Sequence, residues 1–151
     1  MKTLTAGSPA PDFDLPDQDG TRRSLGELLT HGPVVLFWYP AAMTGGCTKE
    51  TCHFRDLAAE FAAVGAQRVG ISMDDVATQA QFAGQYGFDY PLLSDATGEV
   101  ATAYGVRRRF LTPVKRATFV IGTDRVIREV ITSETQMTVH ADRALAALTA
   151  R

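Results

Sequence analysis

The chain has 151 residues, of which 45% are apolar and 21% are charged, and its formal net charge at pH 7 is −2. A chain of this length and composition is expected to form one domain, residues 1–151, with a core that needs no disulfide or metal to stabilise it. The near-neutral charge and the lack of a basic stripe speak against a nucleic-acid partner. No apolar stretch approaches the ~20 residues of a membrane span, so we expect no membrane partner either.

The chain alternates short β-branched or aromatic runs, which predict strands, with longer amphipathic runs, which predict helices. The expected strands are residues 12–15, 21–24, 34–39, 68–72, 92–94, 117–121 and 126–131. The expected helices are residues 25–29, 47–64, 76–86, 98–104 and 138–150.

The order of these elements predicts an α/β fold. The first two strands flank a cluster of turn residues, which indicates an N-terminal β-hairpin. Strand–helix–strand units followed by a hairpin and a terminal helix indicate a mixed central sheet flanked by helices. This order is similar to the thioredoxin-like fold.

The N-terminus and the cysteine content bear on location. Residues 1–9 lack the apolar core of a signal peptide, which predicts a cytoplasmic protein. Thiols in the cytoplasm are normally kept reduced. A structural disulfide is therefore not expected, whereas one that forms and breaks during a reaction is allowed.

Cys47 and Cys52 are the only sulfhydryl groups of the chain, and both lie in the helix expected over residues 47–64. A thiol in the first turn of a helix has unpaired backbone N–H groups and the positive end of the helix dipole beside it. Both features favour the thiolate over the thiol. Cys47 is therefore the candidate nucleophile.

Other interpretations of the two cysteines stay open at this point. A cysteine is often simply a small buried hydrophobic residue. The Cys-x4-Cys spacing differs from the Cys-x-x-Cys of thioredoxin-type dithiols and zinc sites, and the three histidines, His31, His53 and His140, form no spaced pair. We therefore expect no metal and no cofactor.

The residues around Cys47 resemble a known family. Pro40, Thr44 and Cys47 match Pro-x-x-x-Thr-x-x-Cys, the active-site signature of peroxiredoxins. The chain is similar in particular to the bacterioferritin-comigratory protein, or peroxiredoxin Q, subfamily. The segments that carry this similarity follow in the same order and are residues 10–13, 39–40, 46–56 and 116–121.

The resemblance implies a thiol peroxidase that reduces hydrogen peroxide and organic hydroperoxides. Cys47 would be the peroxidatic cysteine, which attacks a peroxide oxygen and becomes a sulfenic acid. Cys52 would be the resolving cysteine, and thioredoxin would be the usual reductant. Because resolution within one chain needs no second copy, we expect a monomer.

The resemblance also implies four further site residues. Thr44 would hold the peroxide through its hydroxyl, and Pro40 would shield the sulfenic acid from water. Arg116 would pair with the thiolate, and Glu50 would orient that arginine. Taken alone, Thr44 could simply cap the helix, Glu50 could be an ordinary first-turn acid, and Pro40 could merely end the strand.

The spacing of the two cysteines also has a consequence for any disulfide between them. Five residues along an α-helix give about 7.5 Å of rise and about 140° of rotation, so the two Cα atoms would lie roughly 8–9 Å apart. A disulfide bridges at most ~7 Å. If Cys52 resolves Cys47, the first turns of the helix must unwind. Gly45 and Gly46, which stand where the family often has Pro-Gly, make this segment easier to rearrange.

Two other functions compete with the peroxidase. A non-enzymatic redox sensor would use the same two thiols but would barely turn over. A thioredoxin-like copper chaperone would use both cysteines and a histidine, but such proteins favour Cys-x3-Cys and an export or membrane signal, and this sequence has neither.

Overall fold

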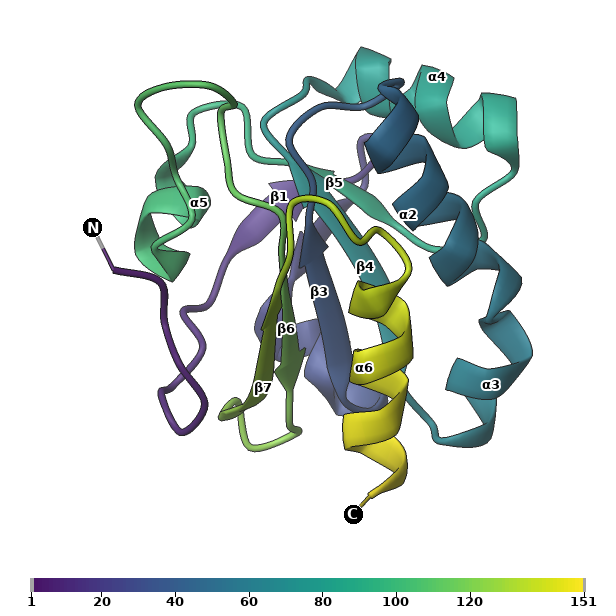
Figure 1. Ribbon diagram of the computed structural model, residues 1–151, viewed down its shortest axis with the longest axis vertical. Helices are drawn as coiled ribbons and strands as arrows, with labels where there is room; N and C mark the ends of the chain where they lie inside the picture. The colour runs from purple at the N-terminus through teal and green to yellow at the C-terminus, as the bar shows by residue number, and fades with distance from the viewer. Residues whose placement is uncertain (1, 151) are drawn as a thin grey trace.

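A five-stranded mixed sheet forms the centre of the computed structural model, which describes residues 2–150 (Figure 1). In spatial order its strands are β5 (Leu92–Ser94), β4 (Gln67–Ser72), β3 (Val34–Trp38), β6 (Ala117–Ile121) and β7 (Ile127–Thr132). β3 pairs parallel with β4 and antiparallel with β6. The expected mixed α/β sheet is confirmed.

The expected N-terminal hairpin is also present. β1 (Asp14–Pro16) pairs antiparallel with β2 (Arg22–Ser24) and forms a separate two-stranded sheet. The Asp17 carboxylate accepts hydrogen bonds from the N–H groups of Asp19 and Thr21 and pairs with Arg23. Such a side-chain bond to nearby backbone is a typical way for aspartate to fix a turn.

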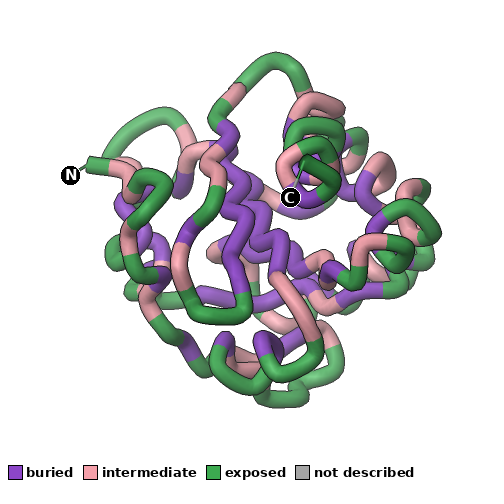
Figure 2. Tube along the Cα trace, turned by 90° about the horizontal axis from the view of Figure 1, so that it is seen from below, coloured by how far each residue is buried: buried purple, intermediate pink, exposed green. Residues whose placement is uncertain are grey.

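Helices cover both faces of the large sheet. They are α1 (Leu25–Leu28), α2 (Gly45–Asp56), α3 (Ala58–Ala63), α4 (Val76–Tyr86), α5 (Glu99–Tyr104) and α6 (Val139–Thr149), with a 3-10 turn η1 (Leu29–His31) after α1. Figure 2 shows the buried strands running between helices whose outer sides are exposed. None of these helices, within residues 2–150, has the length and apolar character needed to cross a bilayer.

β3 divides the core into two layers. Successive side chains of a strand point to opposite faces, and every residue of β3 is buried. Leu36 and Trp38 pack in the layer that contains Leu28 of α1 and Tyr104 of α5. The alternate β3 side chains join the layer that holds residues of α2, α3, α4 and α6, and this second layer contains Cys47.

The single helix expected over residues 47–64 is wrong. α2 ends at Asp56, α3 begins at Ala58, and Leu57 between them leaves the helical region with φ −96° and ψ 22°. Arg68 Nη1 of β4 donates to the Phe54 carbonyl at 2.9 Å. In a continuous helix that carbonyl would accept from the N–H of Ala58. The break therefore lies where a residue from another element competes for a helix acceptor.

Candidate active site

Cys47 lies in the first turn of α2, at the point where the chain has just left the central strand β3. It is 1% exposed and, like Cys52, is a free thiol. The helix begins at Gly45, so Cys47 is among the first four residues, whose backbone N–H groups have no partner within the helix. The expected position of the candidate nucleophile at a helix N-terminus is confirmed.

Thr44 occupies the cap position of α2 but does not cap the helix with its side chain. Its Oγ1 donates to the Ala41 carbonyl at 2.8 Å, and the residue is exposed. The lone pairs of the hydroxyl therefore remain free to accept a hydrogen bond from a ligand. Pro40 is half-buried in the same loop between β3 and α2.

Arg116, far along the chain, reaches Cys47. Its Nη2 donates to Cys47 Sγ at 3.3 Å, and its Nη1 donates to Glu50 Oε1 at 2.7 Å. Burial by itself would lower the pKa of Arg116, but the charge and hydrogen bonds of the acidic groups Glu50 and Cys47 outweigh it and hold that pKa above its ordinary value. Arg116 is a permanent cation in contact with both groups.

Glu50 lies completely buried one turn after Cys47. Burial raises the pKa of its carboxyl from 4.5 to about 8, although the charge and hydrogen bonds of Arg116 oppose this change. Only Oε1 is hydrogen-bonded, because Oε2 has no hydrogen-bond partner among the described residues. The site therefore contains a carboxyl group that favours its protonated form near neutral pH.

His140 of α6 forms the wall behind Glu50, and sequence reasoning did not assign it to the site. It is fully buried, with Nε2 at 2.9 Å from the Ser133 carbonyl and Nδ1 at 2.8 Å from Thr118 Oγ1. Because a carbonyl only accepts, the ring hydrogen lies on Nε2, and Nδ1 accepts from the Thr118 hydroxyl. Burial lowers the pKa of His140, so the ring is neutral.

Glu134 is a second residue that sequence reasoning missed. Its Oε2 accepts from the backbone N–H of Arg116 at 2.9 Å and lies 3.5 Å from Arg108 Nη2. This contact fixes the backbone from which the Arg116 side chain extends. Thr118 lies two residues after Arg116. Because the side chains of a strand alternate between its two faces, those of Arg116 and Thr118 both point to the face of the sheet that α2 and α6 cover.

One feature of the sequence could have indicated that His140 is a buried polar residue. It interrupts the apolar stripe of the last helix, whose buried members include Ala141, Ala144 and Leu148. A buried histidine on an apolar helix face needs hydrogen-bond partners. The partners come from β6 and from the segment before α6, and no local pattern predicts such contacts.

Cys52 lies five residues after Cys47 on the same helix and is half-buried. The helical rotation of about 140° places it on a different face from Cys47. It packs against the core layer that contains Phe54 and Tyr90. Burial raises the pKa of the Cys52 thiol, with Arg55 acting in the opposite direction.

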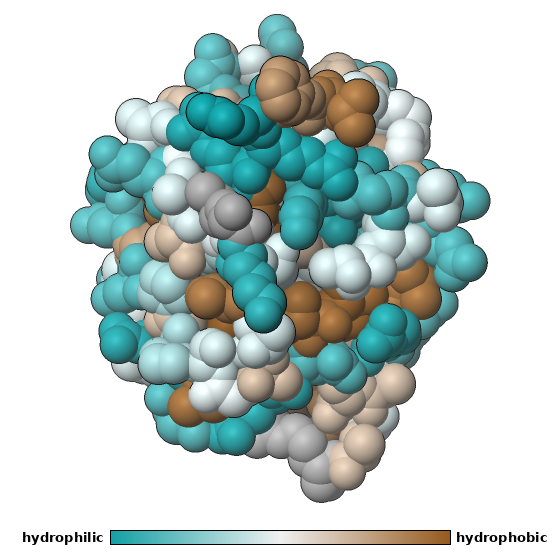
Figure 3. Space-filling view, turned by 60° about the vertical axis from the view of Figure 1, so that its left-hand side comes forward, coloured by the Kyte–Doolittle hydropathy of each residue, from teal (hydrophilic) through white to brown (hydrophobic). Residues whose placement is uncertain are grey.

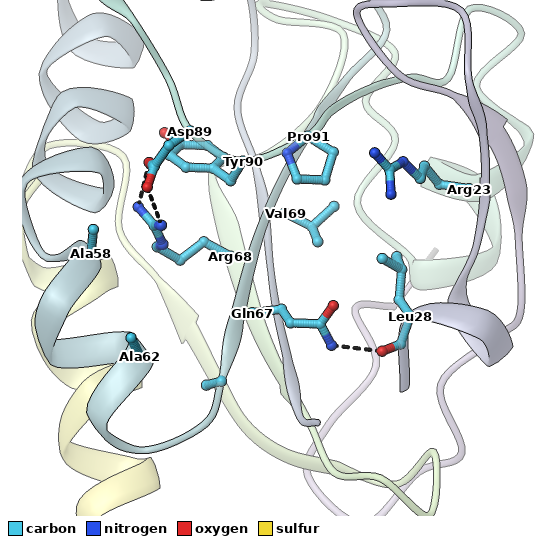
Figure 4. Close-up of a pocket in the computed structure, with 11 residues that line it drawn as sticks. Arg23, Leu28, Ala58, Ala62, Gln67, Arg68, Val69, Asp89, Tyr90 and Pro91 are labelled. Carbon is cyan, nitrogen blue, oxygen red and sulfur yellow. Dashed lines mark hydrogen bonds and ion pairs between the residues drawn. The ribbon is translucent and has the colours of Figure 1, made fainter. Parts of the chain in front are cut away.

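No group of three or more His, Cys, Asp or Glu side chains in the part of the chain that the structure describes is arranged to hold a metal ion. A cavity of about 270 Å³ lies between α3, β4 and the segment before β5, and neither cysteine lines it (Figure 4). Its arginines are already paired, Arg68 with Asp89 and Arg23 with Asp17. We therefore place the candidate active site at Cys47 and not in this cavity.

The chain is similar to known proteins over nearly its whole length. A family model described as the AhpC/TSA family matches residues 6–130. A relative from Mycobacterium tuberculosis (strain ATCC 25618 / H37Rv), whose name assigns it to the peroxiredoxins, is 63% identical over 153 residues, which cover 99% of this chain and 97% of the relative. The chloroplastic peroxiredoxin Q of Oryza sativa subsp. japonica is 38% identical over 143 residues, which cover 94% of this chain and 65% of that protein.

Solved structures agree with this similarity. The crystal structure of peroxidoxin BcpB from Mycobacterium tuberculosis matches with a TM-score of 0.94 and 62% identity, over 97% of each chain. Peroxiredoxin Q of Xanthomonas campestris matches with a TM-score of 0.86 and 27% identity, over 99% of this chain and 96% of that one. The chain therefore belongs to the AhpC/TSA family, among the peroxiredoxins of the peroxiredoxin Q type, and is a thiol peroxidase.

Proposed function

We propose that Cys47 is the sulfur that reduces peroxide, that Cys52 resolves the oxidised form, and that thioredoxin restores both thiols. The contact between Cys47 Sγ and Arg116 Nη2 at 3.3 Å carries this proposal. A permanent cation in contact with a buried sulfur at a helix N-terminus favours the thiolate, which is the nucleophilic form. Hydrogen peroxide and organic hydroperoxides are the substrates that this chemistry fits.

In the first step the Cys47 thiolate attacks one peroxide oxygen. The S–O bond forms, the O–O bond breaks, the sulfur is oxidised to a sulfenic acid, and the leaving oxygen takes up a proton as water or an alcohol. Charge develops on both oxygens, so donors around them stabilise the transition state. Arg116 and the free N–H groups of the first turn of α2 supply such donors.

Two residues of the loop before α2 complete this step. The Thr44 hydroxyl, which already donates to the Ala41 carbonyl, accepts a hydrogen bond from the peroxide and so orients it. Pro40 has no N–H group and its ring is apolar, so we assign it the role of keeping water from the new sulfenic acid. Glu50 holds Arg116 in position through the bond of 2.7 Å.

In the second step Cys52 attacks the sulfur of the sulfenic acid. An S–S bond forms, and hydroxide leaves and is protonated to water. Because the two cysteines lie on different faces of α2, this step requires the first turns of the helix to unwind. The dithiol of thioredoxin then reduces the disulfide, and one chain in the cytoplasm, acting as a single domain and a monomer, completes the cycle.

The loop after α5 offers a contact for the reductant. It carries three consecutive arginines, Arg107 to Arg109, followed by Phe110 and Leu111, which are 79% and 95% exposed. Figure 3, which brings this side of the molecule forward, shows apolar atoms standing above a hydrophilic band at the top of the face. A cationic loop with an apolar tip fits a reductant with an acidic, partly apolar surface.

Coupled peroxidase turnover of the wild type, Cys47→Ser and Cys52→Ser tests the proposal. We expect no activity from Cys47→Ser with any reductant. Cys52→Ser reduces one equivalent of peroxide and then stalls as the sulfenic acid unless a small thiol resolves it. Full thioredoxin-dependent turnover by Cys52→Ser would contradict its resolving role.

The same assay separates the enzyme from a redox sensor. A sensor forms the disulfide once and then waits for its partner, so peroxide consumption would stop near one equivalent even with thioredoxin and its reductase present. The peroxidase consumes peroxide for as long as reductant remains. Thioredoxin-dependent consumption of many equivalents is the expected result.

A further inference from the structure

The reduced site holds two acidic groups beside one cation. Arg116 contacts Glu50 Oε1 at 2.7 Å and Cys47 Sγ at 3.3 Å. Glu50 is 0% exposed and Cys47 is 1% exposed. If both acids were ionised, one negative charge would remain out of water without a counter-ion, which is strongly unfavourable.

The surroundings of Glu50 offer no second positive charge among the described residues. The titratable side chains that shift the pKa of Glu50 are Arg116, just before β6, and Glu134, before α6. Around them, His140 of α6 lies 3.6 Å from Glu50 Oε2, Cys47 of α2 shares Arg116 with Glu50, and Tyr90 before β5 has its own pKa raised by the charge of Glu50. Of these, only Arg116 is a cation, because the His140 ring is neutral. Glu134 is negative and raises the pKa of Glu50 further.

We propose that Glu50 and Cys47 share one proton beneath Arg116, and that Glu50 becomes the ionised partner of Arg116 when peroxide consumes the thiolate. This inference rests on the proposed function, in which Cys47 is the sulfur that is oxidised. Glu50 does not touch the peroxide and acts through Arg116, so it is a positioning residue that also carries a proton.

The geometry of Glu50 Oε2 supports the shared proton. Among residues 2–150 this oxygen has no hydrogen-bond partner. It lies 3.6 Å from His140 Nδ1, a nitrogen that already accepts the hydrogen bond of the Thr118 hydroxyl. A bare carboxylate oxygen in that position would be buried without a donor, whereas a protonated carboxyl avoids most of this penalty. The raised pKa of Glu50, about 8, agrees with a carboxyl that holds a proton at neutrality.

The proton balance of the first step then changes. The Cys47 sulfur forms the S–O bond, the O–O bond of hydrogen peroxide breaks, and hydroxide leaves with both electrons of that bond. The hydroxide takes up one proton and becomes water, Glu50 gives up one proton in the same step, and the Glu50 carboxylate replaces the thiolate as counter-ion of Arg116. The cluster carries the same net charge before and after, and no proton is taken from solution.

Proton uptake in a single turnover tests this inference. The Cys52→Ser protein, which stops at the sulfenic acid, is mixed with one equivalent of hydrogen peroxide near pH 7 in weakly buffered solution with an indicator dye. We expect no net uptake per sulfenic acid formed. The Cys52→Ser/Glu50→Gln protein should take up one proton, because glutamine keeps the acceptor toward Arg116 but has no proton to give.

A control and a second readout complete the test. Cys52→Ser/Glu60→Gln, altered at an exposed glutamate of α3, should behave as its parent does. If Glu50→Gln does not fold, the infrared difference spectrum of the parent answers the question, since oxidation should remove the carbonyl band of one protonated carboxyl.

The possible outcomes separate the two proposals. Equal proton uptake with glutamate and glutamine at position 50, at full sulfenic acid yield, overturns the shared proton alone. An infrared spectrum without loss of a carboxylic acid band does the same. Failure of the parent to form a sulfenic acid on Cys47 overturns the proposed function, and the shared proton with it.

Discussion

The two halves of α2 are held in different ways. The second half, residues 51–56, is fixed from outside the helix: Tyr90 Oη donates to the Thr51 carbonyl at 2.6 Å, and the Phe54 ring stacks on Phe37 at a centroid distance of 4.0 Å. The first half, residues 45–50, begins with two glycines and has no side-chain cap. Its main outside partner is the Arg116 side chain.

For the disulfide that we propose between Cys47 and Cys52, this difference predicts which half of α2 moves. Cys52 belongs to the half that is anchored in the core, whereas Cys47 and Glu50 belong to the half held by Arg116. Oxidation to the sulfenic acid removes the negative charge that Arg116 binds at Cys47. In the proposed mechanism the chemical step therefore weakens the contact of Arg116 with Cys47, in the first turn, while Arg116 keeps its contact with Glu50, and we expect unwinding to start in that first turn.

The largest expected effect comes from the anchor of the second half. Phe54→Ala removes a fully buried ring and should lower the free energy of unfolding by about 3–5 kcal/mol, measured by denaturant titration of the reduced protein. Phe110→Ala, which removes a ring that is 79% exposed, serves as the control and should change it by less than about 0.5 kcal/mol. A similar small loss from Phe54→Ala would contradict the anchored half.

The next largest expected effect is on the free energy of unfolding. It depends on pH and comes from Glu50, in the first half of α2. The pKa of Glu50 is about 8 when buried and 4.5 when exposed, so its contribution to stability is fully present below pH 4.5 and is lost as the pH rises through 8. Between pH 5 and pH 8 the wild type should lose roughly 3 kcal/mol more stability than Glu50→Gln.

Unfolding titrations of both reduced proteins at the two pH values measure this difference. His140 and Cys47 are present in both proteins, so the comparison measures the titration of Glu50 together with its coupling to these two neighbours. Parallel pH dependence in the two proteins would show that Glu50 holds the same protons in the folded and unfolded states.

The two halves of α2 also show which parts of the fold and of the site the sequence could predict. The strands, the hairpin and the position of Cys47 in the first turn follow from local periodicity and turn residues, and all are confirmed, the strands to within two residues of their expected bounds. The approach of Arg116 was expected only from the resemblance to a family. The break at Leu57 was missed because it depends on Arg68, and His140 was missed because its partners come from other elements.

A smaller effect should come from the glycines of the first half. An added Cβ at Gly45 would meet no atom of the described residues within 4 Å, so we expect Gly45→Ala to stabilise the wound helix by about 0.5–1 kcal/mol without steric cost. Disulfide formation, which needs the helix unwound, should slow about two- to fivefold. Oxidation of Cys47 should keep its rate, and stopped-flow fluorescence with peroxide separates the two steps.

Gly84→Ala is the matched control, since its Cβ would also meet nothing within 4 Å but it lies in α4. It should leave both steps unchanged. Slowing of disulfide formation by both substitutions would mean that global stability and not the first half of α2 sets the rate. Gly46 is unsuited to this comparison because its Cβ would lie 3.3 Å from Arg116 Nη2.

The smallest expected effect tests whether surface contacts help to anchor the second half. His53 Nε2 of α2 lies 2.7 Å from Asp142 Oδ1 of α6, but the Asp142 side chain is 60% exposed. Solvent screens such a pair, so a double-mutant cycle of His53→Ala and Asp142→Ala should give a coupling energy below about 0.5 kcal/mol. A coupling above ~1.5 kcal/mol would show that α6 and not the buried ring of Phe54 fixes this half. The small value is expected because the anchor is Phe54 with the hydrogen bonds from Tyr90 and Arg68, all made on the side of α2 that faces the core.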